Sequence, residues 1–510
     1  MYAVEMLGIT KRFGSTTAND RVTLQILSGE IHSLLGENGA GKTTLMKILY
    51  GMLRPEEGEI RIRGERRSLE GPSDAIKLGI AMVHQHFMLV DALSVAENIV
   101  LGYEPRKGAM FDAKKAEAEV AALAGRFGMK LDPRQKVGEL PVGAKQRVEI
   151  LKALYREADV LILDEPTAVL TPLEVGDLFR VLRELQASGK TIVIITHKLK
   201  ETMELANRAT VLRGGTVVAT VDIAETSSEG LAEMMVGRQV SFEPAPPSAV
   251  ADRPKLLELK NVSMSKRRVP VLNNIDLSLY GGEIVGIAGV EGNGQTELIE
   301  AVTGLHPIDA GEVRFRDQDV TAATPLDRIA MGIGHIPEDR NALGLVGAFS
   351  LKENSILGLQ RRPAFQRGGV LRSEEIASHA ARIRADYSIK SEHIETPARA
   401  LSGGNQQKIV IGRVLSQNPD VIVAAQPTRG VDIGAIEYIH ERLVEMRDRG
   451  KAILLVSAEL EEIRKLSDRI AVLYEGRIVA FGPKESFTEN ELGAYMTGGS
   501  ADGKNGGGRE

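Results

Sequence analysis

Short apolar runs recur along the chain between glycines, acidic residues and polar segments, in an alternation typical of strands and helices. The runs at 31–35, 160–163 and 191–196 have the length and composition of strands buried in a parallel sheet. Two other segments carry apolar residues at helical spacing, after the predicted N-caps Asp112 and Ser373. Their apolar positions are Ala113, Ala116, Val120, Leu123 and Phe127 in one segment, and Ile376, Ala380, Ile383 and Tyr387 in the other. The pattern predicts an α/β protein with added helical packing faces.

The segment 36–43 follows the first of these strands and has the composition of a phosphate-binding loop. Its glycines at 36, 39 and 41 let backbone N–H groups turn toward an anion, at the positive end of the following helix. Lys42 can place a charge on the β and γ phosphates, and the hydroxyl of Thr43 can coordinate Mg²⁺. Apolar residues at helical spacing follow, as this interpretation requires: Leu45, Met46, Ile48 and Leu49.

Titratable and polar residues follow three further predicted strands. Asp164 and Glu165 end one of them, where a pair of carboxylates is costly unless a cation needs it. A solvated turn is the alternative. His197 ends a second strand, and Gln85 follows the apolar run that closes at Val83-His84.

The second half repeats the first with losses. The loop 289–296 follows the first loop by 253 residues, and Gln295 stands where its lysine would be. The offset grows to 256 at Glu353-Asn354 and to 261 at Pro427-Thr428, as small insertions in one duplicated fold would produce.

Length and composition agree with two domains. We predict domains at 1–240 and 256–497, a proline-containing linker at 241–255 and a disordered Gly-rich tail at 498–510. No segment approaches the roughly 18 consecutive apolar residues of a membrane span, and the N-terminus lacks the pattern of a secretion signal. The absence of cysteine excludes disulfides and thiolate metal sites, and a net charge of −5 gives no general attraction to nucleic acid.

The segment Leu401-Ser402-Gly403-Gly404-Asn405-Gln406-Gln407 completes a set of motifs in one order along the chain. Together with the phosphate loop, Gln85, the Asp164-Glu165 pair and His197, it resembles the ATP-binding cassette family. The resemblance implies two tandem P-loop NTPase-type nucleotide-binding domains, each with a RecA-like mixed-sheet core and a helical subdomain. The fused pair looks like the ATPase of simple-sugar and nucleoside importers, and the segments 84–90, 166–172 and 336–340 look most like the nucleoside branch.

The resemblance also implies the role of each site residue in an ATPase. Glu165, His197 and Gln85 would be catalytic, and Thr43, Gln85 and Asp164 would hold Mg²⁺. The residues that would contact ATP are Phe13, Gly36, Asn38, Gly39, Gly41, Lys42, Thr43, Thr44, Asp164, Ser402, Gly403, Gly404 and Asn405. Phe13 would stack on adenine, although an isolated aromatic residue is more often part of a core.

In the family, two modules sit head to tail, so that each ATP lies between one phosphate loop and the other signature. The first-half signature is degenerate, because Pro141 has no N–H and Val142 replaces a glycine. The second half has lost the other parts, at Lys266, Gln295, Ala425-Gln426 and Ala458. The losses are complementary and predict one working composite site and one defective site.

A chain of this kind needs a membrane partner. The resemblance implies integral-membrane permease subunits, an extracytoplasmic solute-binding protein that acts indirectly, no nucleic acid, and a peripheral position on the cytoplasmic face of the cell membrane. Phe87, Met88 and Leu89 are candidate permease contacts, with a core role as the alternative. Three other functions stay open: a ribose- or galactose-type sugar importer, a twin-cassette ATPase acting on ribosomes or nucleic acid, and a structural partner without turnover.

Overall fold

The protein separates into two compact units, Met1–Val240 (the first unit) and Ser241–Glu510 (the second unit). The structure, a computed structural model, describes residues 1–14, 16–84, 87–108, 110–167, 170, 172–239, 244–246, 248, 253–290 and 292–499. The predicted α/β class is confirmed, because each unit combines a mixed six-stranded sheet, a four-stranded antiparallel sheet and a lobe of helices.

The sheets of the first unit supply its core. The six-stranded sheet has the order β12-β11-β3-β10-β9-β6, and of these strands only β12 is antiparallel to its neighbour. Its strands are β3 (Ile31–Leu35), β6 (Ile80–Val83), β9 (Val160–Asp164), β10 (Thr191–Thr196), β11 (Arg208–Arg213) and β12 (Thr216–Asp222). The antiparallel sheet has the order β2-β1-β4-β5, with β1 (Tyr2–Phe13), β2 (Thr16–Leu27), β4 (Glu57–Ile62) and β5 (Glu65–Arg67).

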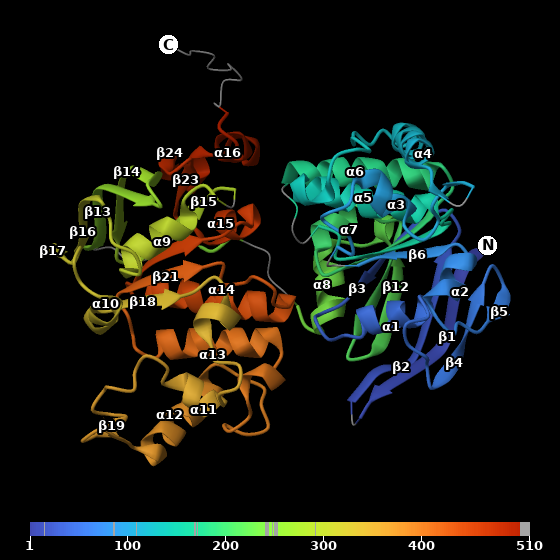
Figure 1. The fold of residues 1–510 in the computed structure, drawn as a ribbon. Helices are drawn as coiled ribbons and strands as arrows, with labels where there is room; N and C mark the ends of the chain where they lie inside the picture. The colour runs from blue at the N-terminus through green and yellow to red at the C-terminus, as the bar shows by residue number, and fades with distance from the viewer. Residues whose placement is uncertain are drawn as a thin grey trace, which may run out of the picture. The chain divides into compact units, whose positions relative to one another are not determined.

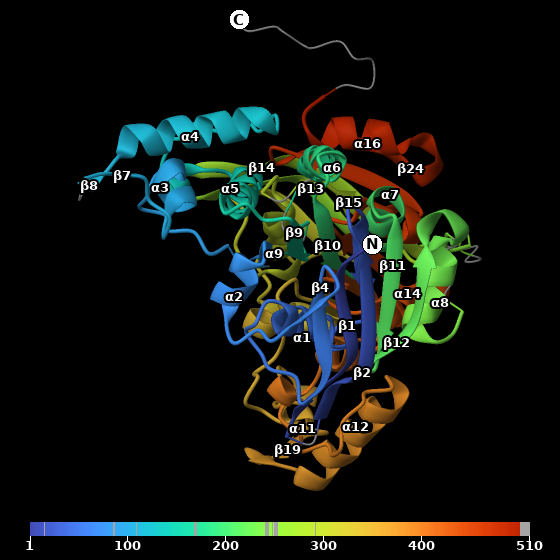
Figure 2. The same ribbon diagram turned by 90° about the vertical axis from the view of Figure 1, so that its right-hand side faces the viewer.

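The helices of the first unit fall into two groups. In Figure 2, α3, α4 and α5 gather with the β7–β8 hairpin on one side of the unit, and α8 lies beside β11 and β12 on the other. The elements of the helical lobe are α3 (Val95–Val100), β7 (Arg106–Lys107), β8 (Met110–Phe111), α4 (Ala113–Arg126), η1 (Val137–Glu139) and α5 (Val142–Tyr155). The others are α1 (Lys42–Leu49), α2 (Pro72–Lys77), α6 (Pro172–Ala187), α7 (Leu199–Leu205), η2 (Ile223–Glu225) and α8 (Ser228–Val236).

The second unit repeats this plan. Its sheets have the orders β18-β21-β22-β15-β23-β24 and β14-β13-β16-β17. Their strands are β13 (Lys255–Lys266), β14 (Val269–Tyr280), β15 (Glu283–Ala288), β16 (Ala310–Phe315), β17 (Gln318–Asp319), β18 (Ile333–Ile336), β21 (Val421–Ala425), β22 (Ala452–Val456), β23 (Arg469–Tyr474) and β24 (Arg477–Pro483).

In Figure 1, α11, α12 and β19 form a lobe set apart from β13 and β16. The lobe contains α11 (Leu351–Ser355), β19 (Gln366–Arg367), β20 (Val370–Leu371), α12 (Ser373–Asp386), η4 (Ala398–Ala400) and α13 (Gly403–Leu415). The remaining elements are α9 (Gln295–Thr303), α10 (Pro325–Met331), the π-helical turn η3 (Arg340–Gly344), α14 (Ile433–Asp448), α15 (Leu460–Leu466), η5 (Lys484–Ser486) and α16 (Glu489–Met496). Within the described residues, no helix of either unit has the length and apolar character that crossing a membrane requires.

Parallel pairing brings the candidate site residues of the first unit to one edge. Leu35 lies opposite Thr196, Asp164 opposite Ile195 and Val83 opposite Leu163. The carboxyl ends of β3, β6, β9 and β10 therefore meet at the same edge of the sheet, which is where ligands bind in α/β proteins.

The two predicted N-caps have different outcomes. Asp112 is confirmed as an N-cap, because its side chain accepts a hydrogen bond from Lys115 N–H, but Ser373 is the first residue of α12 and its N-cap Arg372 makes no side-chain cap. Helix α13 begins at Gly403, inside the segment 401–407. In the predicted linker, Ala245 N–H donates to Lys465 O and β13 begins at Lys255. In the predicted tail, the N–H groups of Gly498 and Gly499 donate to carbonyl groups of α16. Residues 500–510 lie outside the described residues.

His335 in β18 gives the second unit a pH-dependent stability. Its Nε2 is buried without a hydrogen-bond partner among the described residues, and burial lowers the pKa of His335 to about 4. The unfolded chain takes up a proton near pH 6.5, whereas the folded side chain stays neutral, so stability falls as the pH drops from 6.5 toward 4. Met82 occupies the same position of β6, so His335→Met is a natural replacement.

We expect the free energy of unfolding of the wild-type chain to fall by about 1–2 kcal/mol more than that of His335→Met between pH 7 and pH 5. Urea denaturation of the full chain at both pH values measures the difference. Equal losses in the two proteins would contradict this assignment.

Candidate functional site

The loop between β3 and α1 needs glycine at its two ends. Gly36 and Gly41 have φ values of 154° and 97°. A Cβ at Gly36 would lie 2.4 Å from Leu212 O, and one at Gly41 would lie 2.2 Å from Ala18 O. Any side chain there would displace backbone, so the loop keeps its tight curve directly before the N-terminus of α1. Such a loop offers its N–H groups and the helix dipole to an anion.

Lys42 turns back over this loop. Its Nζ donates to Gly36 O at 2.6 Å and to Glu37 O at 3.0 Å, and the residue is only 6% exposed. Burial lowers the pKa of Lys42, and the charges of Glu165 and Asp164 oppose that shift. The charge of Lys42 is thus held inside the loop by two neutral carbonyl groups.

Asp164 and Thr43 lie together beneath the loop. Asp164 is buried at the end of β9, and the Thr43 side chain forms a hydrogen bond with it. Burial, followed by the neighbouring charge of Glu165, raises the pKa of Asp164 to about 6. A carboxylate with a raised pKa beside a hydroxyl is a site that gains from a cation, and this oxygen donor set suits Mg²⁺.

Glu165, which follows Asp164 in the chain, forms a hydrogen-bonded pair with His197. Glu165 has a left-handed backbone with φ 47°, and its N–H donates to Ile195 O at 2.9 Å. Its Oε1 lies 3.0 Å from His197 Nδ1, and this hydrogen bond is the largest cause that lowers the pKa of Glu165. Glu165 is therefore an ionised carboxylate at neutral pH, aimed by a bond to the histidine.

The periphery of the site is partly described. Phe13 ends β1 with 49% of its surface exposed, and Lys11 Nζ lies 5.6 Å from the centre of its ring, so the ring is open to a stacking partner. Asn38 and Gly39 are exposed on the loop, and Thr44 is half-buried. The structure links five of the predicted first-half residues by hydrogen bonds or charge: Lys42, Thr43, Asp164, Glu165 and His197. Gln85 lies outside the described residues, as do His86, Ala168, Val169 and Thr171.

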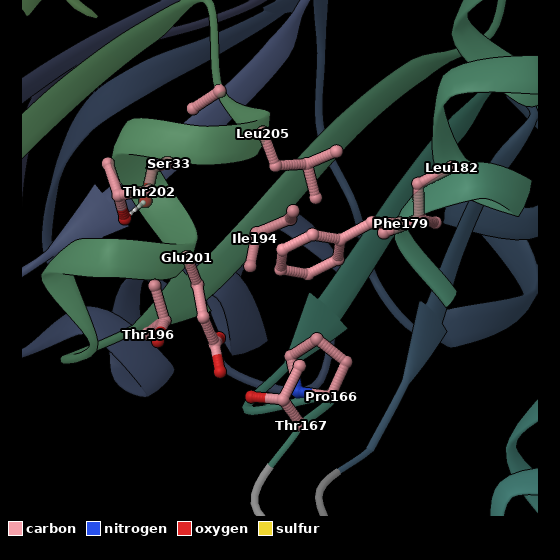
Figure 3. Close-up of a pocket in the computed structure, with 11 residues that line it drawn as sticks. Ser33, Pro166, Thr167, Phe179, Leu182, Ile194, Thr196, Glu201, Thr202 and Leu205 are labelled. Atoms are coloured by element: carbon pink, nitrogen blue, oxygen red, sulfur yellow. Dashed lines mark hydrogen bonds between the residues drawn. The ribbon is translucent and has the colours of Figure 1, made fainter. Parts of the chain in front are cut away.

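A small cavity lies behind the strand ends that carry Asp164 and His197. It measures about 10 Å³ and is lined by residues that include Pro166, Phe179 and Glu201. Figure 3 shows the Glu201 carboxylate next to Pro166 and Thr167, with a hydrogen bond of 2.8 Å between Ser33 Oγ and Thr202 Oγ1. This volume holds at most one water molecule, so the cavity supports the strand ends and does not take a nucleotide.

In the second phosphate loop, the side chain of Gln295 bonds to the backbone of the loop itself. Gln295 Nε2 donates to Val290 O at 2.9 Å, and Gln295 Oε1 accepts from Asn293 N–H at 3.1 Å. Val290 O corresponds to Glu37 O, which Lys42 contacts in the first loop. The Gln295 amide thus makes the bond that Lys42 makes in the first loop, but it carries no charge. Its oxygen also accepts a hydrogen bond from a backbone N–H.

Two carboxylates that the sequence analysis missed add negative charge beside this second loop. Lys266 Nζ lies 3.0 Å from Glu297 Oε1 and 2.7 Å from Glu300 Oε2, both on α9. Glu297 stands where the first unit has Thr44, and a positional comparison of the halves could have found it. Lys266 is therefore neutralised by its own unit in the place that corresponds to Phe13.

The second unit has Ala425-Gln426 in place of the acid pair, and the backbone conformation at Gln426 is the same as at Glu165. Gln426 has φ 45°, close to the value of Glu165, and its N–H donates to Val456 O at 2.7 Å. Its Oε1 accepts from Ala458 N–H at 3.1 Å, at the position of the missing histidine. An amide and a methyl group thus take the positions of the Glu165 carboxylate and the His197 ring.

The two signature segments differ at their helix N-termini. Ser402 is the N-cap of α13, and its Oγ accepts from Asn405 Nδ2 at 2.8 Å. In the first unit, Pro141 is the N-cap of α5, and Gly143 N–H donates to Glu174 Oε1 at 3.2 Å. A carboxylate already occupies the first-unit helix terminus, which disfavours a phosphate there. Sequence reasoning missed Glu174, because it comes from α6 and no local pattern marks it.

The three candidate permease contacts have different environments. Met88 is 63% exposed, Phe87 is half-buried, and Leu89 packs against the core of the helical lobe. Met88 N–H also donates to Glu149 Oε1 at 2.6 Å. Met88 is thus the one of the three whose side chain is free to contact a partner.

A glycine-rich loop between a parallel strand and a helix, with an acid pair and a histidine at the same sheet edge, defines a P-loop nucleoside triphosphate-binding module. The model of the family described as ABC transporter matches residues 19–168 and 272–429, once in each unit. The chain belongs to the ABC transporter family, and the predicted resemblance is confirmed.

Several relatives match nearly the whole chain. It is 49% identical to the guanosine import ATP-binding protein NupO of Bacillus subtilis and 46% identical to the nucleoside import ATP-binding protein NupA of Lactococcus lactis, over 98% of each chain. It is 45% identical to the glucose import ATP-binding protein TsgD13 of Haloferax volcanii, over 97% of this chain and 96% of that one. A solved complex of archaeal ribosome recycling factor aABCE1 with ribosomal stalk protein aP1 shares the fold, with a TM-score of 0.63, 17% identity, and coverage of 93% and 90%.

Proposed function

We propose that the chain is the ATP-hydrolysing subunit of a nucleoside importer, bound to permease subunits at the cytoplasmic face of the membrane. The observation that carries the solute class is the similarity to two import proteins named for nucleosides and guanosine, which extends over 98% of the chain. The first-unit site supports ATP hydrolysis, since loop, lysine, acid pair and histidine meet at one sheet edge.

ATP binds to the first unit through its phosphates and base. The amides of the loop 36–41 and Lys42 hold the β and γ phosphates, and Phe13 stacks on adenine. Asn38 and Thr44 contact the phosphates from the loop and the first turn of α1.

Glu165 is the residue that acts on the attacking water. It accepts a hydrogen bond from the water and orients it in line with the γ-phosphate, while His197 fixes the carboxylate and contacts the phosphate. Thr43, Gln85 and Asp164 would hold Mg²⁺, which neutralises phosphate charge when it is bound.

Ser402, Gly403, Gly404 and Asn405 close this site, in the head-to-tail pairing that the family resemblance implies. Within the described part of the second unit, no side-chain acceptor takes the N–H groups of Gly403 or Gly404, so they remain available to an anion at the start of α13. ATP then joins the two surfaces, and its hydrolysis releases them. The extracytoplasmic solute-binding protein of such a system would deliver the solute to the permease.

We expect Ser402→Ala to lower ATP turnover of the assembled transporter about tenfold or more, because it removes the cap and a donor at the signature. Pro141→Ser, the matched change in the degenerate signature, should leave turnover unchanged. Phosphate release by the transporter in lipid vesicles measures both. Equal sensitivity at the two positions would contradict the composite site.

The solute is tested on the assembled transporter with its binding protein. ATP turnover should rise on addition of guanosine or adenosine and stay at its basal level with ribose, galactose or glucose. Stimulation by a sugar alone would favour the second candidate function, sugar import, which the 45% identical glucose import relative supports.

The third function, action on ribosomes or nucleic acid, has only fold-level support from the ribosome recycling factor. Purification from the source membrane separates it from import. Integral-membrane subunits should accompany the chain, and RNA in their place would overturn the proposal.

A further inference from the structure

The second unit has a π-helical turn after β18. Residues 337–344 follow β18, and the π-helical turn η3 (Arg340–Gly344) lies within them. Asp339 Oδ1 accepts from Asn341 N–H at 2.8 Å and from Ala342 N–H at 3.0 Å. We call residues 337–344 the PEDR loop. Leu343 of this loop is 68% exposed, so its apolar side chain is accessible to a partner.

Arg340 ties this loop to two other segments. Its Nη1 donates to Arg429 O at 2.7 Å and its Nη2 to Gly430 O at 3.2 Å. A Cβ built on Gly403 would lie 2.8 Å from Nη2, so the guanidinium lies directly against the first glycine of the signature. Glu338 and Arg429 form an ion pair that joins the same two loops.

The segment 427–432 in turn contacts the signature helix. Gln407 Nε2 donates to Pro427 O at 2.8 Å. A Cβ on Gly404 would lie 3.1 Å from Asp432 Oδ2, and Asp432 is the N-cap of α14. Arg340 therefore sits where three parts meet: the PEDR loop, the segment 427–432 and the start of α13.

The other end of the PEDR loop is fixed to the same helix. Arg413, near the C-terminus of α13, donates from Nη2 to Gly344 O at 2.7 Å and from Nη1 to Asn354 O at 3.2 Å. With Arg340 next to the start of α13 and Arg413 near its C-terminus, the PEDR loop contacts the signature helix at both ends.

The position of the Arg340 guanidinium against the signature distinguishes the two units. A cation beside a helix N-terminus is unfavourable unless an anion balances it, and the charge of the adjacent Asp339 opposes the effect of burial on the pKa of Arg340. Burial lowers the pKa of Arg340, so the guanidinium is partly desolvated. The first unit has Phe87 at the equivalent position after β6, and the Glu174 carboxylate at its own signature helix. The arginine is thus present in the half with the intact signature and replaced in the half with the degenerate one.

We propose that Arg340 is a positioning residue for ATP hydrolysis, which holds Ser402 and Gly403 in register and transmits movement of the PEDR loop to them. This inference rests on the proposed composite site. Arg340 acts through the signature, so its loss should have no additional effect once the signature is already damaged.

The test is a double-mutant cycle on the assembled transporter, with solute-stimulated phosphate release as the readout. Arg340→Met keeps most of the side-chain length and removes the donors, and we expect it to lower kcat about tenfold. Arg340→Lys should recover part of that loss, because it restores one donor and the charge but not the fork. The variant with both Arg340→Met and Ser402→Ala should fall within about threefold of Ser402→Ala alone.

The exposed Arg361 of the same unit provides the control, and Arg361→Met should have the wild-type rate. A double variant whose loss equals the product of the two single losses would overturn the positioning role. So would an Arg340→Met loss that merely follows a lowered Tm of the chain or a weakened nucleotide affinity of the first unit. A wild-type rate for Ser402→Ala would overturn the composite site itself, and this inference with it.

Discussion

Lys42→Ala is expected to lower steady-state ATP hydrolysis of the assembled transporter at least 100-fold, because it removes the preorganised charge on the β and γ phosphates. In the structure, Lys42 Nζ lies 2.6 Å from Gly36 O within the loop; burial lowers the pKa of Lys42, and the charges of Glu165 and Asp164 oppose that shift. Nucleotide affinity should fall together with the rate. Phosphate release and binding of a fluorescent ATP analogue measure the two effects.

The control for this change is Gln295→Ala in the second loop. Gln295 bonds only within its own loop, to Val290 O and Asn293 N–H, among the described residues. Its removal should leave at least half of the wild-type turnover. A collapse like that of Lys42→Ala would show that both loops contribute to hydrolysis.

Glu165→Gln is expected to lower turnover by about 10²–10⁴ while ATP still binds. The substitution keeps the shape of the side chain and removes the charge that orients the water. The bond from His197 keeps the pKa of Glu165 below its ordinary value, so the wild-type residue is ionised throughout the neutral range. Rate and affinity should therefore separate in this variant, in contrast to Lys42→Ala.

Gln426→Ala serves as the matched control, because Gln426 has the same left-handed backbone in the second unit. Its rate should equal that of the wild type. If Glu165→Gln and Gln426→Ala lower turnover equally, the assignment of the general base to Glu165 is wrong.

Local patterns predicted the parts of the fold that local physics determines. The strand Ile31–Leu35 and the N-cap Asp112 were predicted to the residue, because an apolar run before glycine and an acidic residue before a helix are short-range signals. The start of α13 at Gly403 has no local signal, since Gly403 and Gly404 lack the apolar periodicity that marks a helix. Ser373 failed as a cap because the turn places Arg372 at that position.

The site residues also divide into those that a local pattern predicts and those that depend on contacts between distant segments. The positions of Lys42, Asp164, Glu165 and His197 after predicted parallel strands indicated that they share one sheet edge, because the carboxyl ends of parallel strands meet there. Contacts between distant segments left no local signal. The bond from Gly143 N–H to Glu174, the Lys266 pairs with α9 and the Arg340 junction became visible only in the folded chain.

The asymmetry of the two loops is tested most directly by counting trapped nucleotide. Vanadate holds ADP in a site that has hydrolysed ATP, and labelled ADP retained by the wild-type transporter can be counted per chain. We expect one ADP per chain, absent in Lys42→Ala and retained in Gln295→Ala. Two per chain, or retention in Lys42→Ala, would contradict a transporter that hydrolyses ATP in the first unit alone.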